Sequence, residues 1–564
     1  MQLAANVTPG DDLDWHAIEW KRSYRIVKNL RQRIFRASRE GNLKKVRSLQ
    51  RLMLRCRANV MESVRRVTQV NQGKLTPGID KAVVTTPEAR IELCKKLSQL
   101  ELHKVYPVRR VYIPKRKGKR PLGIPTIDDR CVQAMVKNAL EPFWEARFEG
   151  VSYGFRPGRG CHDAIEKIFR LARPNTRRPW ILDADIEGAF DNIGHSALQK
   201  LIANFPAREL IKQWLKAGYV EDEMLHPTDT GVPQGGIISP LLLNVALHGM
   251  EQALGSYYTS TGTLHGKYAV VRYADDFAVF CPTKEDALEA KAILAKWLET
   301  RGLHLSEGKT HIHHLTEGFD FLGFNIRHYP TPNSSRSGYK LLIKPSNKSI
   351  SQIKRKLKGI WHKHVGSPTV ALINEMNPLI RGWSNYFRIG VAKEIFTKLD
   401  NFMYYRAKRY MKRRHPMKSG WWRTNKYWGR PPGHQDRWVF MDKARNATLR
   451  KFAWTKIVRH RLVPQNYSPD DPTLQDYWRQ RRLKTTTMEY RYQQLFQRQN
   501  GLCPVCHQHL ESGEETHIHH GIPKRHGGTD NLVNLRLVHA NCHRQIHSNS
   551  APLGVRKLLE PGAG

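Results

Sequence analysis

The sequence predicts a multidomain α+β protein, and three observations lead to this prediction. Its 564 residues, of which 40% are hydrophobic and 26% charged, are enough for about three or four globular domains. Residues 105–330 alternate short β-rich runs with helical stretches, whereas helices dominate residues 349–412. Residues 485–550 form a small separate module that is rich in cysteine and histidine.

The elements follow one another along the chain. From Trp15 to about Val70 the pattern is helical and basic, and a break at 40–42 predicts two helices. Residues 71–80 contain two glycines and a proline and predict a loop. A clear helix is expected from Glu285 to Thr300, ended by a glycine. Residues 415–475, rich in tryptophan, proline and glycine, predict no clear element. The β-rich runs lie at 111–113, 180–182, 269–271 and 277–280.

The basic charge of the chain indicates a polyanionic partner. The formal net charge is +44, and residues 340–490 hold 34 basic against 9 acidic residues. A solvated helix face would explain one basic run, and an anionic membrane surface would attract the same charge. Aromatic residues such as Trp361, Tyr410 and Trp421 are interleaved with the basic ones, and aromatic rings stack on unpaired bases. We therefore predict nucleic-acid binding, with folded RNA favoured.

The composition also bears on the compartment. No apolar run reaches 18 residues, so no transmembrane span is expected. Residues 1–10 lack a basic segment followed by an apolar one, which argues against a secretory signal. The eight cysteines form no visible disulfide framework, so a reducing, cytoplasmic location is expected.

Two acidic clusters each follow an apolar run. Tyr-Ala-Asp-Asp at 273–276 lies between two such runs and predicts a β-hairpin with both aspartates at its tip. A second cluster at 183–191 follows the run at 180–182. Adjacent carboxylates repel, and a divalent cation would relieve that cost; hard oxygen ligands suit Mg²⁺, and two such ions can assist phosphoryl transfer. An ordinary Asp-rich turn remains the alternative for 273–276.

With these clusters the chain resembles the reverse transcriptases. Asp185 with Phe190 five residues on, and Tyr-Ala-Asp-Asp 90 residues later, are similar to the palm motifs of that family. The resemblance implies a right-hand polymerase with fingers, palm and a helical thumb. Further similar segments occur in the family's order at 109–115, 120–125, 152–157, 233–240, 305–310 and 319–324.

The resemblance implies roles for four palm residues. Asp185 and Asp275 would bind Mg²⁺, and Asp276 would complete the acidic cluster. Phe190 would lie under the deoxyribose and exclude a 2′-hydroxyl.

Four more residues would surround the incoming deoxynucleoside triphosphate. Gln234 would line its pocket, and Lys115 and Arg120 would hold the triphosphate. Lys309 would approach the leaving pyrophosphate. For the three basic residues a plain surface charge is the alternative.

Two further segments resemble the group II intron branch of the family. Pro-Gln-Gly-Gly at 233–236 occurs in group II intron and retroviral enzymes, and residues 377–387 are similar to the thumb, or maturase, signature of group II intron proteins. A plain helix with Trp383 and Tyr386 in its core is the alternative for 377–387. Residues 71–80 also look like this branch. A DNA-binding region would then fall within 415–480, although no motif supports it.

Two cysteine and histidine pairs predict a zinc site. Cys503-x2-Cys506 is followed by His539-x2-Cys542, the spacing of a tetrahedral structural Zn²⁺ site. Many related sites have cysteine where this chain has His539, so ligation by His539 stays open.

The residues between and after these pairs resemble an HNH endonuclease, a ββα-metal nuclease. The resemblance implies that His520 is the general base and that His519 and His543 hold the catalytic metal, for which Mg²⁺ is the expected ion. It also implies that Asn534 fixes the loop that orients the base. His517 precedes this pair, so the assignment among the three histidines stays open. A purely structural zinc module is the alternative.

These resemblances together imply a group II intron-encoded protein with five domains. It would be an RNA-directed DNA polymerase that assists intron RNA splicing. As a ribonucleoprotein it would support retrohoming, by target-primed reverse transcription after HNH nicking of one DNA strand. A splicing-only maturase, another bacterial reverse transcriptase and a stand-alone nuclease are the alternatives. The expected domains are an N-terminal basic helical extension (1–80), fingers and palm (81–335), thumb (336–414), DNA-binding region (415–484) and HNH domain (485–564).

The expected partners follow from the same resemblance. They are group II intron RNA, target DNA and deoxynucleoside triphosphates, with no membrane partner. The oligomeric state stays open. The expected location is the prokaryotic cytoplasm, on the nucleoid when the protein is bound to DNA.

Overall fold

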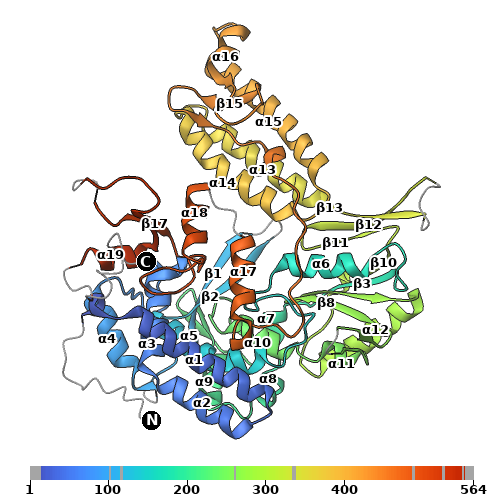
Figure 1. Cartoon of the computed structure of the whole chain (residues 1–564). Coiled ribbons are helices and arrows are strands. Elements are labelled where there is room, and N and C mark those ends of the chain that lie inside the picture. The colour runs from blue at the N-terminus through green and yellow to red at the C-terminus, as the bar shows by residue number, and fades with distance from the viewer. Residues whose placement is uncertain are drawn as a thin grey trace.

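A computed structural model of the chain (Figure 1) provides the architecture. The residues that it describes are 14–100, 103–114, 118–259, 262–332, 338–485, 490–512, 514–523, 527–548 and 552. No helix within these ranges is both long enough and apolar enough to cross a membrane.

The N-terminal layer is helical. Its main members are α1 (Trp20–Arg39), α2 (Leu43–Arg55), α3 (Arg57–Arg65), α4 (Pro87–Leu97) and α5 (Ile127–Glu145), preceded by a 3-10 turn at Trp15–Ala17. The predicted break at 40–42 is present, and the side chain of Asn42 caps α2. The prediction of two helices is wrong, because the extended residue Cys56 separates α2 from α3. Asn59 donates to the carbonyl of Met53 at 3.0 Å and so satisfies the end of α2 at this bend.

Two sheets lie beside this layer. The first has the order β2-β1-β4-β5, and the second, central sheet is antiparallel with the order β10-β3-β9-β8. Their strands are β1 (Val108–Pro114), β2 (Lys119–Ile124), β3 (Trp180–Asp185), β4 (Tyr219–Glu221), β5 (Met224–His226), β8 (Ala269–Tyr273), β9 (Asp276–Cys281) and β10 (His311–His314). All four β-rich runs predicted from the sequence are strands here.

The central strand β9 is buried on both faces. Phe277 and Val279 belong to the hydrophobic core that includes the N-terminal helices, whereas Ala278 and Phe280 belong to the core shared with the later helices. This double burial explains why its sequence is uninterruptedly apolar. The helices around the sheet are α6 (Cys161–Leu171), α7 (Ala189–Asn192), α8 (His195–Leu201), α9 (Arg208–Lys216), α10 (Ser239–Ala246), α11 (Met250–Ala253) and α12 (Lys284–Glu299).

A three-helix bundle stands above the central sheet in Figure 1 and follows a small three-stranded sheet. The strands are β11 (Phe319–Phe321), β12 (Phe324–Pro330) and β13 (Tyr339–Pro345), and the helices are α13 (Asn347–Lys363), α14 (Thr369–Phe387) and α15 (Lys393–Arg414). The aromatic residues of this region mostly fill its core: Trp361 is 4% and Tyr410 2% exposed, and both rings pack against Phe440. The expectation that such rings stack on bases is therefore wrong for these two, whereas Trp421 is 76% exposed.

After the bundle the chain returns across the molecule to the N-terminal helices. Arg159, which lies just before α6, donates to the carbonyls of Pro464, Gln465 and Tyr467. These hydrogen bonds hold the returning segment next to the start of α6. The elements of this part are α16 (Gly420–Tyr427), β14 (Trp428–Gly429), β15 (Val439–Asp442), β16 (Ala447–Thr448), α17 (Gln475–Thr485) and α18 (Tyr490–Arg498).

The C-terminal module comes last and lies beside α1, α3 and α4 in Figure 1. It consists of the hairpin β17 (Thr516–His520) and β18 (Leu535–His539), followed by α19 (Ala540–Ile546). Its buried Leu510 and Leu537 belong to the same hydrophobic cluster as Trp15 and Trp20. The module is therefore packed on the N-terminal layer.

Candidate functional sites

The two acidic clusters meet at one end of the central sheet. Strands β8 and β9 form the predicted hairpin, with Ala274 and Asp275 in its turn and a left-handed Ala274 (φ 59°). Asp276, the first residue of β9, pairs directly with Asp185, the last residue of β3. A Cβ on Gly154 would lie 2.4 Å from the backbone nitrogen of Ala274, so only glycine fits against this turn.

Two of the carboxylates at this edge, Asp275 and Asp276, lie in an environment that disfavours their ionisation. Burial, followed by the charges of Asp275 and Asp185, raises the pKa of Asp276 to about 7. Burial also raises the pKa of Asp275. Lys309 forms an ion pair with Asp185. A divalent cation would stabilise the ionised carboxylates, so the donor set fits such an ion.

The sequence analysis did not single out Asp183, which belongs to the same cluster. Burial, followed by the charge of Asp276, raises the pKa of Asp183 to about 7. Its position two residues before Asp185 places both side chains on one face of β3. The Asp-x-Asp spacing was the signal that could have identified it.

The predicted nucleotide residues are partly joined by hydrogen bonds. Arg120 Nε donates to Gln234 Oε1 at 2.8 Å, and Gln234 Nε2 donates to Asp191 Oδ2 at 3.0 Å. Phe190 is 8% exposed, and its ring lies edge-on to Phe155 with centroids 6.3 Å apart. Lys115 lies outside the described residues.

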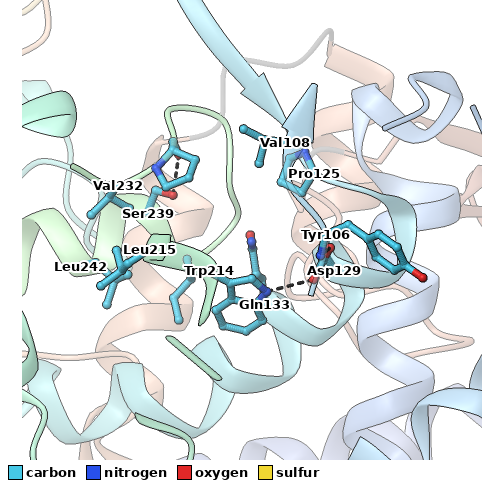
Figure 2. A pocket seen from close by; sticks show the side chains of 12 residues that line it. Tyr106, Val108, Pro125, Asp129, Gln133, Trp214, Leu215, Val232, Ser239 and Leu242 are labelled. Carbon is cyan, nitrogen blue, oxygen red and sulfur yellow. Dashed lines mark hydrogen bonds between the residues drawn. The ribbon is translucent and has the colours of Figure 1, made fainter. Parts of the chain in front are cut away.

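A small pocket beneath the 233–239 loop shows how that loop is held (Figure 2). Ser239 Oγ donates to the carbonyl of Pro233 at 2.8 Å, and the backbone N–H of Ile237 donates to Gln133 Oε1 at 2.8 Å. Below the loop, Trp214 Nε1 donates to Asp129 Oδ1 at 2.9 Å. This buried network fixes the loop that presents Gln234.

The 377–387 segment lies on α14 and faces inward at several positions. The ring of Trp383 packs against Phe387 and Phe396, as the core alternative for this residue expects. Tyr386 donates its hydroxyl to the carbonyl of Leu322 at 2.8 Å. Asn377 donates to the carbonyl of Thr448 at 2.9 Å, which ties α14 to β16.

Four metal-binding side chains converge in the C-terminal module. Ligand atoms of Cys503, Cys506, His539 and Cys542 lie within 4.8 Å of one another, and all four residues are buried. His539 Nδ1 lies 3.3 Å from Cys506 Sγ. Three thiols and one imidazole at this spacing fit a metal ion.

A second cluster lies between the hairpin and α19. His519, His543 and His547 have ligand atoms within 4.8 Å of one another, and burial, followed by His543, lowers the pKa of His519 to about 4. Neutral imidazole is the form that binds metals, so this cluster also fits an ion. His547 was not among the predicted ligands; it caps the C-terminus of α19, and its spacing of four from His543 puts both on one side of that helix.

The other two predicted nuclease residues lie outside this three-histidine cluster. His520 Nε2 is 2.8 Å from Asp530 Oδ1. The amide of Asn534 bridges the loop, since its Oδ1 accepts from the N–H of Ile522 at 2.6 Å and its Nδ2 donates to the carbonyl of Thr529 at 2.9 Å. His517 Nδ1 lies 3.4 Å from His543 Nδ1 but outside the three-histidine cluster.

Four segments of the chain match known families. Residues 113–326 match reverse transcriptase (RNA-dependent DNA polymerase), and residues 15–97 match the N-terminal domain of reverse transcriptase. Residues 350–428 match the group II intron maturase-specific domain, and residues 503–549 match HNH endonuclease.

Curated relatives agree with these matches. Protein YkfC of Escherichia coli is 34% identical over 301 residues, which cover 46% of this chain and 78% of that protein. The group II intron-encoded protein LtrA of Lactococcus lactis is 33% identical over 425 residues, which cover 59% of this chain and 69% of LtrA. An uncharacterized 91 kDa protein in the cob intron of Schizosaccharomyces pombe is 29% identical, over 56% of this chain and 48% of that protein.

The fold and the matches define a reverse transcriptase that carries a maturase domain and an HNH endonuclease domain. The chain belongs to the family of group II intron-encoded proteins. It is an RNA-directed DNA polymerase and a DNA endonuclease, with roles in intron splicing and mobility.

Proposed function

We propose that the protein supports target-primed reverse transcription by its own intron ribonucleoprotein. The intron RNA inserts into one DNA strand, the C-terminal module nicks the other strand, and the polymerase copies the RNA from the 3′-end so made. The observation that carries this proposal is the presence of two separate candidate metal sites in one chain. One site is formed by carboxylates at the tip of the β8–β9 hairpin, and the other is formed by histidines between β17 and α19.

In the polymerase site Asp185 and Asp275 bind Mg²⁺, and Asp276 completes the acidic cluster. The support is the direct pairing of Asp185 with Asp276 and the position of Asp275 in the adjoining turn. Bound Mg²⁺ supplies Lewis-acid assistance to phosphoryl transfer. Phe190 excludes ribonucleotides.

Three basic residues and one amide serve the triphosphate in this proposal. Lys115 and Arg120 hold it, and Gln234 lines its pocket, supported by the hydrogen bond between Arg120 and Gln234. Lys309 approaches the pyrophosphate, supported by its ion pair with Asp185.

In the nuclease site His520 acts as the general base. Asp530, 2.8 Å away, orients its imidazole, and Asn534 holds the neighbouring loop. His519, His543 and His547 hold the divalent metal, for which Mg²⁺ is our proposal. Zn²⁺ occupies the Cys503, Cys506, His539 and Cys542 site in a structural role.

The domain limits and partners complete the proposal. The five domains span 1–80, 81–335, 336–414, 415–484 and 485–564. Intron RNA, target DNA and deoxynucleoside triphosphates are the partners. The protein acts in the prokaryotic cytoplasm, on the DNA of the nucleoid.

The test uses two variants of the reconstituted ribonucleoprotein on target DNA. Asp275→Asn should lower copying from a supplied primer at least about 100-fold, because a metal ligand is lost, and should leave nicking intact. His520→Ala should abolish nicking and leave copying from a supplied primer intact. Each variant is thus the control for the other.

Two results would contradict these assignments. Normal primer extension by Asp275→Asn would remove the polymerase assignment. Normal nicking by His520→Ala would remove the base assignment, and His517→Ala and His519→Ala would then be compared. Glu299→Gln, at the remote end of α12, should change neither activity.

A further inference from the structure

Arg65 belongs to the N-terminal layer but reaches the cysteine cluster of the C-terminal module. It is the last residue of α3 and is 1% exposed. Its Nη2 donates to Cys542 Sγ at 3.2 Å, across 477 positions of sequence. The guanidinium carbon lies 4.7 Å from the centroid of the Trp20 ring, which covers one side.

The acidic neighbours of Arg65 provide an ion pair but no hydrogen bond to it. Glu514 Oε2 is 3.7 Å from Nη2, too far for a hydrogen bond, and Glu514 Oε1 accepts instead from the backbone N–H of Asn541. Glu62 accepts from Gln508 Nε2 at 2.5 Å. Within the part of the chain that the structure describes, Nε and Nη1 of Arg65 are buried without a hydrogen-bond partner.

Burying a guanidinium in this way is costly unless a strong negative charge lies beside it. Three thiolates, one neutral imidazole and one divalent ion carry a net charge of −1. A buried site of that charge needs a cation nearby. Arg65 is the cationic side chain that donates to one of its sulfur atoms.

We propose that Arg65 is a positioning residue for the metal of the C-terminal module. Its guanidinium, on the N-terminal layer, neutralises the negative charge of the metal–thiolate cluster. Retention of the metal and docking of the module on the N-terminal layer are therefore coupled. This inference rests on the metal site proposed above for Cys503, Cys506, His539 and Cys542.

The docking surface around Arg65 supports the coupling. Gln545 Nε2 on α19 donates to the carbonyls of His16 and Ile18 at 2.7 and 2.9 Å. The side chain of Gln508, in the loop after Cys506, reaches Glu62 on α3. The helix that carries Arg65 is thus held by the same module whose sulfur atom it contacts.

The first test measures zinc release from the full-length protein into a chromophoric chelator. Arg65→Gln keeps a donor but removes the charge, and should release zinc on the order of 10–100-fold faster, the usual effect of losing an outer-shell partner. Arg65→Lys keeps the charge and should fall between Arg65→Gln and the wild type. Arg66→Gln changes the exposed neighbour and should release zinc at the wild-type rate.

A further variant separates metal support from simple ion pairing. If Arg65 acted only as the ion-pair partner of Glu514, then Glu514→Gln would speed zinc release as much as Arg65→Gln does. That result would overturn the inference. Our inference expects Glu514→Gln to release zinc no faster than the wild type, because the change removes a competing negative charge.

The outcomes distinguish this inference from the site on which it rests. A wild-type protein that binds no zinc overturns the metal site itself. A wild-type protein that binds one zinc, together with an Arg65→Gln variant that releases it at the wild-type rate, overturns only the role of Arg65.

The second test needs no variant and so covers a failure of Arg65→Gln to fold. Coupling is reciprocal, so removing zinc from the wild-type protein should increase amide hydrogen exchange in residues 57–65 of α3. Residues 349–361 of α13, in the three-helix bundle and outside the N-terminal layer, are the internal reference. Unchanged exchange in 57–65 after complete zinc removal would overturn the coupling.

Discussion

Phe190 is almost entirely enclosed, and its ring lies edge-on to that of Phe155. A ring in this place would occupy the volume that a ribonucleotide's 2′-hydroxyl needs. Phe190→Ala should therefore raise the efficiency of ribonucleotide incorporation more than it lowers that of deoxynucleotides. Steady-state incorporation of both nucleotides measures the ratio. Phe190→Tyr keeps the ring and should keep the ratio, and an unchanged ratio in Phe190→Ala would reduce Phe190 to a core aromatic.

His248 lies against the rings of Trp144 and Phe148, and burial, followed by the charge of Arg272, lowers its pKa to about 4. An unfolded histidine titrates near 6.5, so the unfolded chain takes up this proton first as the pH falls. The stability that neutral His248 contributes is present above about pH 6.5 and is lost between about 6.5 and 4.

His248→Phe removes this titration and keeps an aromatic ring. From pH 7 to pH 5 the wild type should lose on the order of 2 kcal/mol of unfolding free energy relative to the variant. Urea unfolding of both proteins at the two pH values measures the difference. A difference that does not change with pH would show that His248 is protonated at the same pH in both states.

Individual site residues differ in how far the sequence predicts them. The Asp185 and Asp275 clusters follow strands whose apolar runs are readable, so their meeting at one sheet edge could be anticipated. Asp183 and His547 carry only a spacing signal, two residues from Asp185 and four residues from His543. Their proximity to the other ligands depends on which face of β3 and α19 is turned inward, and that is decided by packing.

The cysteine cluster of the C-terminal module joins the loop at 503–506 to the junction of β18 and α19, where His539 and Cys542 lie. A structural zinc site supplies folding free energy to a small module. Cys503→Ser should therefore open the module to protease at sites after about residue 485, while α1–α3 also lose their covering surface. Limited proteolysis with mapped cleavage sites tests this. His520→Ala, which leaves the cluster intact, is the matched control and should resist cleavage like the wild type.

A helix boundary can be predicted only where the sequence carries a breaking or capping residue. The break at 40–42 has a glycine and a capping asparagine and was predicted. The break at Cys56 has no such residue; Asn59 satisfies it through contacts with Met53 and with Met135 on α5. In the three-helix bundle, likewise, the sequence shows that Trp361 and Tyr410 lie among basic residues, but only the helix packing shows that their rings face inward.

The charge of +44 predicts how the assembled protein responds to salt. Counterion release lowers the logarithm of the RNA affinity by about 0.7 to 0.9 per phosphate contact for each logarithmic unit of salt. Intron RNA binding should therefore weaken by about 10³-fold or more between 50 and 200 mM salt if six or more contacts form. Filter binding across this range gives the slope.

A charge variant calibrates that slope. Arg409→Gln with Lys412→Gln, both exposed on α15, should reduce its magnitude by roughly 1 to 2 if both contact phosphate. A salt-independent affinity in the wild type would mean that the charge serves another purpose.

The order of the polymerase, maturase and HNH segments along the chain could be predicted because each carries its own motif. Their arrangement could not. The return of residues 456–474 across the molecule depends on Arg159, which donates to the carbonyls of Pro464, Gln465 and Tyr467. Nothing in the sequence near Arg159 indicates that it contacts this segment. The same holds for the docking of the C-terminal module on the N-terminal helices.

The contact of Gln545 with His16 and Ile18 sets an order of events during synthesis. These partners are separated by 529 and 527 positions, and at about 5–20 residues per second the ribosome needs roughly 25–100 s to make the chain between them. Throughout that time the surface around Trp15 and Trp20 has no module to cover it. The nascent chain therefore presents an apolar surface that chaperones can recognise, and that surface closes only after the module that carries Gln545 has been made.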